Sequence, residues 1–294
     1  MTISEVKNAL AKYGIRPNKL LGQNFLVDEN ILKKIVDVAN IKPDETILEI
    51  GPGLGELTFE LAQRAKKVIA VEKDRTLFEI LKNEIAKRGI NPHTKDFGVG
   101  VKNIELICGD VLRIDMGIFA RISPYHVVAN IPYYLTARVI RKLLEEVEQP
   151  QSIMLTVQKE VAERITAKPP EMNLLALAVQ VYGEPKIIFP ISKSAFWPEP
   201  EVDSAVIAIE NISRQKFIKA EVGEKLFFKI IRAAFQGKRK VLANSLSHNL
   251  KINKEKVDSL IKQAGLGFGD RPETISVDKW LRLTDVLAKK LPEE

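Results

Sequence analysis

The sequence contains very few of the residues that form disulfides and bind transition metals. Its 294 residues include one cysteine and three histidines. The single Cys108 cannot form an internal disulfide, and a zinc site would have to rest mainly on carboxylates. We therefore expect no bound metal, and we expect a reducing, cytoplasmic setting.

Long apolar runs are missing as well. No run approaches the roughly 18 to 20 residues that a membrane-spanning helix needs. The first residues, MTISEVKNALAKYG, form a polar amphipathic stretch that lacks the apolar centre of a signal peptide. These absences predict a soluble protein that is neither inserted into a membrane nor exported.

Excess charge is absent from most of the chain and is concentrated at one end. Residues 1–210 carry 27 Lys and Arg against 28 Asp and Glu, whereas residues 211–294 carry 18 against 10. The formal net charge of +7 therefore comes from the last part of the chain. This distribution predicts a catalytic body joined to a module that faces a polyanion, with nucleic acid as the leading partner class.

The hydrophobic pattern predicts an α/β fold. Short β-branched runs alternate with helical periods, which is typical of a parallel sheet with crossover helices. The expected strands are 46–50, 67–71, 104–107, 126–129 and 152–157. Two further runs, 186–189 and 205–209, lack a convincing helix between them, so we expect them to pair antiparallel.

From about residue 216 the apolar spacing is purely helical. We therefore expect two domains. The α/β domain would span residues 1–212, and a small, basic, all-helical domain would span residues 213–294, with the linker near 211–215.

A glycine-rich turn follows the first expected strand. Glycines at 51, 53 and 55 would let the backbone approach a ligand closely, next to the N-terminus of the following helix. Their spacing is G-x-G-x-G, whereas a dinucleotide fingerprint is G-x-G-x-x-G, and Glu56 stands where the third glycine of that fingerprint would be. The spacing therefore disfavours pyrophosphate binding, and a purely structural turn is the alternative.

Carboxylates end the next two expected strands. Glu72 is placed where a carboxylate can accept hydrogen bonds from both ribose hydroxyls, and Asp110 follows Gly109 at the end of the third strand. The alternatives are a solvated glutamate and an ordinary helix N-cap. Acidic and glycine-rich strand ends at one edge favour a nucleoside that carries a cationic group, which is S-adenosylmethionine rather than NAD.

The fourth strand runs into the sequence Asn-Ile-Pro-Tyr at residues 130–133. An asparagine side chain and a proline-fixed turn can direct carbonyl oxygens at an exocyclic amine, and Tyr133 offers a flat face to a base. The alternative is a common turn with a core tyrosine. After a glycine loop and two acidic strand ends, binding of a base is the favoured interpretation.

Ordered sequence blocks extend along almost the whole chain. They are LGQNFL at 21–26, EIGPGLG at 49–55, VEKD at 71–74, GD at 109–110, NIPY at 130–133, FWPEPEVDS at 196–204 and KRKVLANSL at 238–246. Together they resemble the KsgA (RsmA) family of ribosomal RNA adenine dimethyltransferases. The resemblance implies a Rossmann-like S-adenosylmethionine-dependent methyltransferase sheet of seven strands with an antiparallel last strand.

The resemblance also assigns roles to individual residues. The residues that it implies hold the target adenine for methylation are Asn130, Ile131, Pro132, Tyr133 and Phe196. It implies cofactor contacts from Gln23, Asn24, Leu26, Glu49, Gly51, Gly53, Glu72, Asp110, Val111 and Asn130. We expect RNA binding at Lys238, Arg239 and Lys240. Trp197 follows Phe196 directly, which leaves open which of the two aromatic rings faces the base.

The implied activity is dimethylation, from S-adenosylmethionine, at N6 of two adjacent adenosines in the 3'-terminal hairpin of small-subunit ribosomal RNA. The partner would be an assembling small ribosomal subunit, and we expect a monomer. Two alternatives remain, a large-subunit RNA adenine methylase of the antibiotic-resistance type and a non-catalytic nucleic-acid-binding factor on the same fold. The segment 89–100 looks longer than the usual connection in the family, and we expect a surface loop there.

Overall fold

The computed structural model describes residues 2–17, 22–88, 103–114, 117, 123–237 and 241–290. The segment 89–100 and the expected RNA-binding residues Lys238, Arg239 and Lys240 lie outside the described residues. The chain divides into two compact units. The first comprises Met1–Ala162 and Lys186–Glu210, and the second comprises Glu163–Pro185 and Asn211–Glu294.

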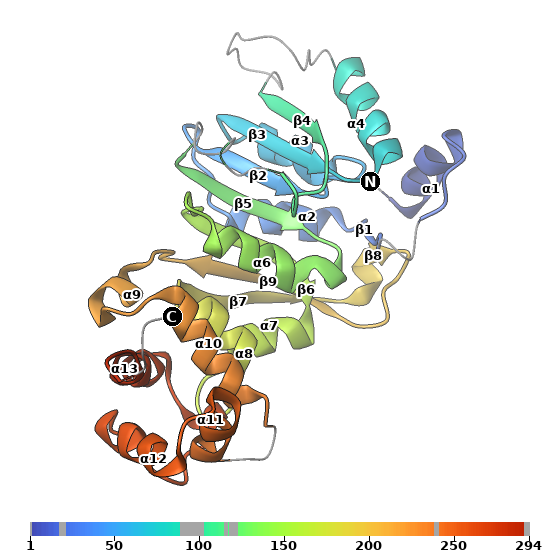
Figure 1. Ribbon diagram of the computed structural model, residues 1–294. Helices are drawn as coiled ribbons and strands as arrows, with labels where there is room; N and C mark the ends of the chain where they lie inside the picture. Colours follow the sequence, from blue (N-terminus) through green and yellow to red (C-terminus); the bar gives the residue numbers. More distant parts are fainter. Residues whose placement is uncertain are drawn as a thin grey trace. The chain divides into compact units, whose positions relative to one another are not determined.

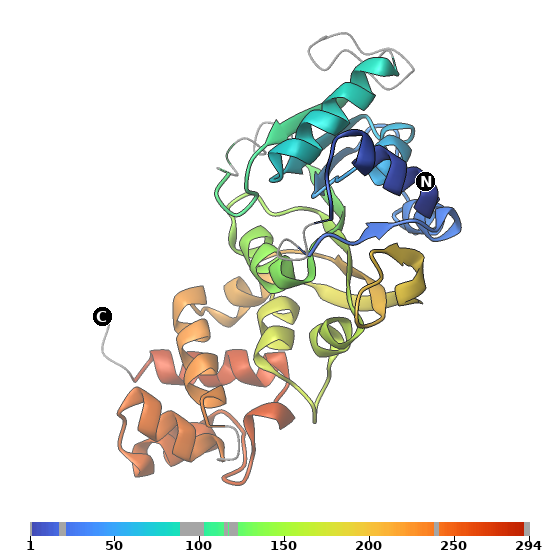
Figure 2. The same ribbon diagram turned by 90° about the vertical axis from the view of Figure 1, so that its right-hand side faces the viewer.

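A seven-stranded sheet forms the centre of the first unit, with helices on both of its faces (Figures 1 and 2). Its strand order is β4-β3-β2-β5-β6-β9-β7. The strands are β2 (Thr46–Ile50), β3 (Lys67–Glu72), β4 (Ile104–Cys108), β5 (Tyr125–Asn130), β6 (Ser152–Gln158), β7 (Glu184–Ile191) and β9 (Ser204–Glu210). Strands β2 to β6 pair in parallel, and β9 pairs with β6 antiparallel.

The register of the parallel strands brings their carboxyl ends to one edge of the sheet. Glu72 of β3 lies opposite Cys108 of β4, and Asn130 of β5 lies opposite Thr156 of β6. All five residues of β2 are buried, as expected for a central strand that is covered on both faces. Ligands of open α/β sheets bind at this edge, so the fold gathers the expected site residues there.

Amphipathic helices cover the sheet. They are α2 (Glu29–Val38), α3 (Glu56–Ala62), α4 (Arg75–Lys87) and α6 (Thr136–Glu145), and the division of the chain into two units falls within α7 (Lys159–Thr166). The helix α1 (Ile3–Lys12) packs instead in a second cluster with Leu54 and with Leu77 and Ile80 of α4. Asp28 and Asp74 cap α2 and α4 by accepting hydrogen bonds from two backbone N–H groups each. Apolar residues of α2, α3 and α4 pack with the sheet in one buried cluster.

A second, two-stranded sheet lies in the first unit. In it, β1 (Phe25–Leu26) pairs antiparallel with β8 (Phe196–Trp197), which follows the short 3-10 helix η3 (Lys193–Ala195). Phe25 lies opposite Trp197, and Leu26 lies opposite Phe196. This ribbon joins the segment that contains Gln23 and Asn24 to the segment that contains Phe196. The sequence did not predict it.

The second unit is helical. Its helices are α8 (Leu174–Gln180), α9 (Gln215–Ala220), α10 (Glu224–Phe235), α11 (Leu242–Leu250), α12 (Lys254–Gln263) and α13 (Val277–Ala288), with the 3-10 helix η4 (Pro272–Thr274). Its core contains an aromatic cluster in which the ring centroids of Tyr182 and Phe217 lie 5.3 Å apart and those of Phe217 and Phe227 lie 5.4 Å apart.

The compact units differ from the expected division after residue 212 because the segment 163–185 packs with the C-terminal helices. Its Tyr182 lies in the aromatic cluster and donates a hydrogen bond to Glu224 Oε2 at 2.6 Å. The backbone N–H of Met172 also donates to the carbonyl of Glu273 at 2.9 Å. The predicted strands and C-terminal helices are confirmed. No helix within the described part of the chain is long and apolar enough to span a membrane.

Candidate cofactor and target-base site

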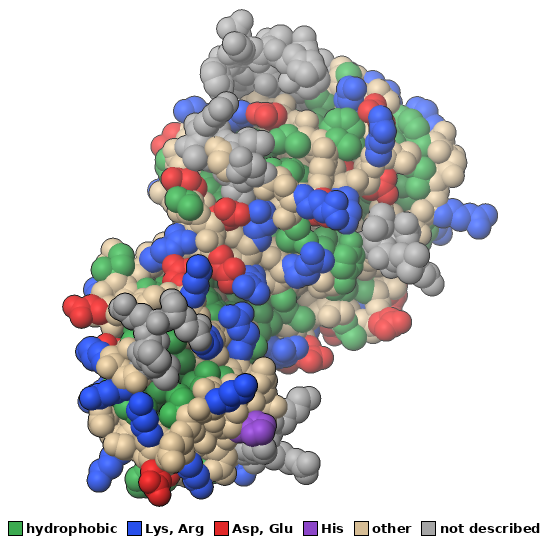
Figure 3. Space-filling view, in the orientation of Figure 1, with side chains coloured by type: hydrophobic (Ala, Val, Ile, Leu, Met, Phe, Trp, Pro, Cys, Tyr) green, Lys and Arg blue, Asp and Glu red, His purple; other side chains and the backbone are tan. Residues whose placement is uncertain are grey.

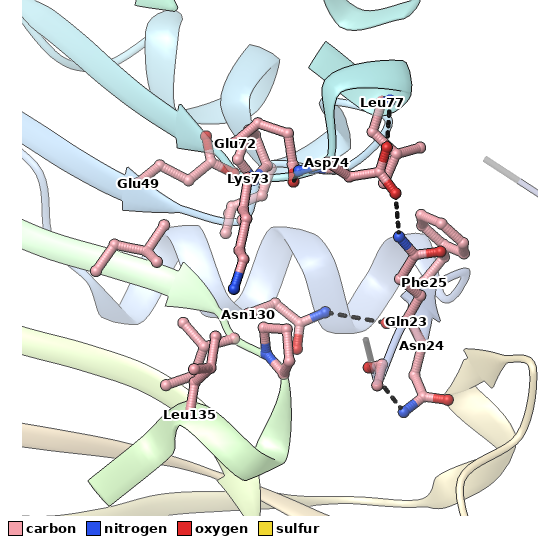
Figure 4. Close-up of a pocket in the computed structure, with 18 of the residues that line it drawn as sticks. Gln23, Asn24, Phe25, Glu49, Glu72, Lys73, Asp74, Leu77, Asn130 and Leu135 are labelled. Atoms are coloured by element: carbon pink, nitrogen blue, oxygen red, sulfur yellow. Dashed lines mark hydrogen bonds between the residues drawn. The ribbon is translucent and has the colours of Figure 1, made fainter. Parts of the chain in front are cut away.

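A pocket opens at the carboxyl edge of the sheet, between the ends of β2, β3 and β5 and the segment that leads into β1 (Figure 4). Of the residues expected to bind the cofactor or the target base, all except Phe196 line it. These are Gln23, Asn24, Leu26, Glu49, Gly51, Gly53, Glu72, Asp110, Val111, Asn130, Ile131, Pro132 and Tyr133. The fold therefore brings together residues from five separate sequence blocks.

The glycine turn after β2 has left-handed backbone conformations, with φ of +59° at Gly53 and +91° at Gly55. A Cβ atom on Gly55 would collide with Cδ1 of the buried Leu81 in α4, so a larger residue here would force that side chain to shift. A Cβ atom on Gly53 would lie 3.3 Å from a ring atom of Phe25, which also lines the pocket. Gly51 and Gly53 therefore line the pocket, whereas Gly55 does not.

Glu72, at the end of β3, is held rigidly by backbone groups. Its Oε2 accepts a hydrogen bond from Gly53 N–H at 3.1 Å, and its Oε1 accepts one from Asp74 N–H at 2.7 Å. Burial raises the pKa of this carboxyl, while the two N–H donors act in the opposite direction. Because each carboxylate oxygen can accept a second hydrogen bond, both retain acceptor capacity for ribose hydroxyls.

Glu49, in β2, is a carboxyl group buried at the floor of the pocket. It is 1% exposed, and its Oε2 has no hydrogen-bond partner within the described residues. Its pKa is raised to about 8, mainly by burial; the Thr58 side chain acts against this rise, and the nearby Glu72 charge adds to it. A cationic ligand that binds beside this buried carboxyl group would favour its ionised form and would pair with it.

Asp110 follows β4 at the rim. Its Oδ1 accepts a hydrogen bond from Leu112 N–H at 3.0 Å, and its Oδ2 lies 3.1 Å from Lys73 Nζ. Partial burial raises the pKa of Asp110, but the Leu112 N–H and the Lys73 ammonium outweigh it and leave the pKa below its ordinary value. The ammonium of Lys73 extends into the pocket (Figure 4).

Hydrogen bonds to Asp74 and Asn130 hold the segment that precedes β1 beside the pocket. Gln23 Nε2 donates to Asp74 Oδ2 at 2.9 Å, while Asp74 Oδ1 caps α4 (Figure 4). Asn24 Nδ2 donates to the carbonyl of Gly22 at 3.4 Å, and the backbone carbonyl of Asn24 faces Asn130. The Gln23 amide thus positions this segment through Asp74.

The end of β5 presents the groups expected to meet the target base. Asn130 Nδ2 donates to the Asn24 carbonyl at 3.5 Å, which orients the amide so that Oδ1 remains an acceptor (Figure 4). Tyr133 begins the 3-10 helix η2 (Tyr133–Leu135), and its hydroxyl lies 2.6 Å from Ser204 Oγ. Burial raises the pKa of Tyr133, and the Ser204 hydroxyl opposes that shift.

Phe196 has a different environment from the one that the sequence suggested. It is 2% exposed and belongs to the buried cluster of the sheet and its helices, and it does not line the pocket. Trp197 is partly buried and packs against a second cluster that includes α1, with Lys7 Nζ 5.5 Å from its ring centroid. Neither ring lies at the pocket wall in this structure.

Sequence reasoning missed part of the pocket. The additional lining residues include Val6, Phe25, Leu54, Leu77, Tyr134 and Leu135. Phe25 lies inside a recognised block, and Leu77 begins the apolar face of α4, so a signal existed for both. Val6 of α1 had none, because its contact with the pocket joins segments that are distant in sequence.

The pocket residues fit S-adenosylmethionine on three observations. Glu72 retains acceptor capacity at a ribose position, Glu49 presents an unpartnered buried oxygen to a cation, and Gly53 leaves room that a side chain would fill. Together with the seven-stranded sheet and its antiparallel strand, these features define an S-adenosylmethionine-dependent methyltransferase.

Comparison with known proteins narrows this class. Residues 14–289 match the family model described as ribosomal RNA adenine dimethylase, and the chain belongs to that family. It is 40% identical over 282 residues to the ribosomal RNA small subunit methyltransferase A of Dehalococcoides mccartyi (strain CBDB1), covering 96% of this chain and 92% of that protein. It is 40% identical over 297 residues to the protein of the same name from Geobacillus kaustophilus (strain HTA426), covering 98% and 96%.

Solved structures agree with this fold. The 23S rRNA methyltransferase ErmE is 25% identical with a TM-score of 0.66, covering 90% of this chain and 100% of that one. A dimethyladenosine transferase from Plasmodium falciparum is 24% identical with a TM-score of 0.72, covering 88% and 95%. The predicted family and fold class are confirmed.

Proposed function

We propose that this chain transfers methyl groups from S-adenosylmethionine to N6 of two adjacent adenosines in the 3'-terminal hairpin of small-subunit ribosomal RNA. The observation that carries the proposal is the orientation of Asn130, whose Nδ2 is directed to the Asn24 carbonyl while its Oδ1 remains available in the pocket. The relatives that share about 40% identity with this chain are named small subunit methyltransferases, which supports the small subunit as substrate.

The chemical difficulty is the adenine amine, whose lone pair is delocalised into the ring. Two acceptors placed against the N6 hydrogens favour a pyramidal nitrogen and expose that lone pair. Asn130 Oδ1 and the Ile131 carbonyl are the acceptors that this chain offers, and Pro132 fixes the turn between β5 and η2. The bound cofactor supplies an electrophilic methyl group on a sulfonium.

Such a site mainly has to align the adenine amine with the methyl group and to exclude water. Asn130 is neutral, so it places no full negative charge beside the sulfonium that would stabilise the ground state. No general base is required in the motif, because the methylated amine is acidic enough to lose its proton afterwards. Tyr133 would stack on the extruded base, with its ring fixed through the hydroxyl bond to Ser204.

The second unit is the proposed site of RNA docking. On α10, Lys225, Lys229 and Arg232 follow one another at helical spacing, and all three are exposed. Figure 3 shows basic side chains distributed over the visible face of this unit. We include Lys238, Arg239 and Lys240 in the proposed RNA-binding surface because they follow α10 directly in the sequence.

The proposal includes an assembling small-subunit particle as the substrate, a monomeric enzyme and a cytoplasmic location. The deciding experiment is to incubate the protein and S-adenosylmethionine with small and large ribosomal subunits that lack the modification, and then to map the methylated adenosines. We expect dimethylated adenosines only in the small-subunit RNA. Methylation of the large subunit would favour the antibiotic-resistance type of activity, and binding without methylation would favour a non-catalytic factor.

A further inference from the structure

Tyr134 is an exposed aromatic residue at the mouth of the pocket. It is 50% exposed and lines the pocket directly after Tyr133, as the second residue of η2. An aromatic ring with half of its surface in water forgoes part of the free energy that burial would provide. Its position beside the proposed base-binding residue raises the question of what covers it during the reaction.

The two adjacent tyrosines are held differently. The Tyr133 hydroxyl lies 2.6 Å from Ser204 Oγ, so that ring is fixed within the pocket. No hydrogen bond of the Tyr134 hydroxyl is found within the described part of the chain. The Tyr134 ring lies beside Gly22, where a Cβ atom would come within 3.4 Å of Tyr134 Cδ1. Gly22 has a φ of +60°, a conformation that favours glycine and lets the ring approach the backbone.

We propose that Tyr134 is a stacking platform for the nucleotide next to the target adenosine. The inference rests on the proposed function, because it concerns the RNA strand that delivers the target base. Moving one base out of an RNA strand removes a stacking partner from its neighbour, and proteins commonly replace such partners with aromatic rings. A half-exposed aromatic residue that lines the pocket proposed to receive the target matches that requirement.

Stacking on a tyrosine face does not depend on the hydroxyl or on the identity of the base, because every base has a π-face. The structure agrees with a role for the ring alone, since the Tyr133 hydroxyl bonds to Ser204 whereas no described residue bonds to the Tyr134 hydroxyl. The proposal therefore makes a specific distinction. Removal of the Tyr134 ring should weaken binding of the RNA, whereas removal of the hydroxyl should not.

The first test compares Tyr134→Ala, Tyr134→Phe and the control Val147→Ala, which shortens an exposed side chain that does not line the pocket. Methyl transfer is measured with unmodified small subunits. Tyr134→Ala should raise KM for the particle roughly tenfold, within the range that base–aromatic stacking supports. Its kcat and its affinity for S-adenosylmethionine should stay within twofold of the wild type, and the other two variants should behave as the wild type does.

The second test uses particles whose RNA carries an abasic nucleotide directly before or directly after the adenosine pair, so that both target adenosines are kept. With the wild type, this lesion should raise KM by about the same factor as the Tyr134→Ala substitution, and it should add nothing when combined with that variant. The inference would be overturned, and the proposed function left standing, if the lesion and Tyr134→Ala multiplied each other's effect on KM. An unchanged KM for Tyr134→Ala would have the same meaning. A wild-type protein that methylates no small-subunit adenosine would overturn the proposed function as well.

Discussion

Glu49→Gln should stabilise the protein without its cofactor, and increasingly so as the pH rises. The wild-type carboxyl is 1% exposed, and its pKa is raised by burial from 4.5 to about 8 in the folded protein. Between these two values the unfolded chain has lost the proton while the folded protein retains it. The free energy of unfolding therefore falls as the pH rises from about 4.5, and the loss is complete above about 8.

The size of the loss in stability follows from the size of the Glu49 pKa shift. One pKa unit corresponds to about 1.4 kcal/mol. Between about pH 5 and pH 8.5 the wild type should therefore lose about 4 kcal/mol of stability through Glu49 alone, an order-of-magnitude figure. Glutamine has nearly the same shape and carries no charge, so the variant should not show this loss.

Urea unfolding of the wild type and of Glu49→Gln at several pH values measures the difference directly. Glu79→Gln is the matched control, because it removes an exposed carboxylate from α4 in the same unit. The control should follow the wild type across the whole pH range. Parallel curves for the wild type and Glu49→Gln would show that the buried carboxyl does not titrate as its burial requires, and the reasoning would be refuted.

The same carboxyl should couple cofactor binding to proton release. A cation bound near the unpartnered Oε2 favours the ionised form of Glu49, so the wild type should release up to one proton on binding at neutral pH. Titration calorimetry in buffers of different ionisation enthalpy counts that proton. Binding by Glu49→Gln should be independent of the buffer.

Three further variants test the remaining parts of the site. Glu72→Ala should weaken S-adenosylmethionine binding by about 1 to 3 kcal/mol, because it removes charge-assisted hydrogen bonds to the ribose; unchanged affinity in titration calorimetry would remove Glu72 from the cofactor site. Asn130→Ala should lower the single-turnover rate of methyl transfer by about 10² or more, and wild-type turnover would rule out the proposed activation of the amine. Replacing Lys238, Arg239 and Lys240 with Gln should leave cofactor binding intact and reduce the salt dependence of binding to the small subunit by roughly one log-log unit for each lost phosphate contact; an unchanged slope would direct the search for the docking surface to the first unit.

The sequence predicted the sheet well, and the small errors have a common cause. The expected third and fourth strands stopped before Cys108 and Asn130, because these residues are not β-branched. In the structure both continue the ladder, since Cys108 lies opposite Glu72 and Asn130 lies opposite Thr156. Both residues lie at the carboxyl edge of the sheet, where Asn130 lines the pocket and Cys108 is exposed.

Pairings between distant segments could not be predicted. The two-residue strands β1 and β8 are too short to show an alternating pattern, so the sequence could not decide between Phe196 and Trp197 as the ring that faces a base. The structure buries Phe196 in the core and packs Trp197 near α1. The hydrogen bond between Gln23 and Asp74 could not be predicted either, because it joins residues that are 51 positions apart.

The position of β9 between β6 and β7 has a consequence for synthesis of the protein on the ribosome. The β6 residues from Ile153 to Gln158 pair with the β9 residues from Ser204 to Ile209, so one edge of β6 has no partner until β9 has emerged. Five of the seven residues in β6 are buried in the finished sheet. A nascent chain that stalls before β9 therefore presents an apolar, unpaired strand edge, which is a template for aggregation. The completed sheet, and with it the support for Tyr133 through Ser204, becomes available only near the end of the first unit.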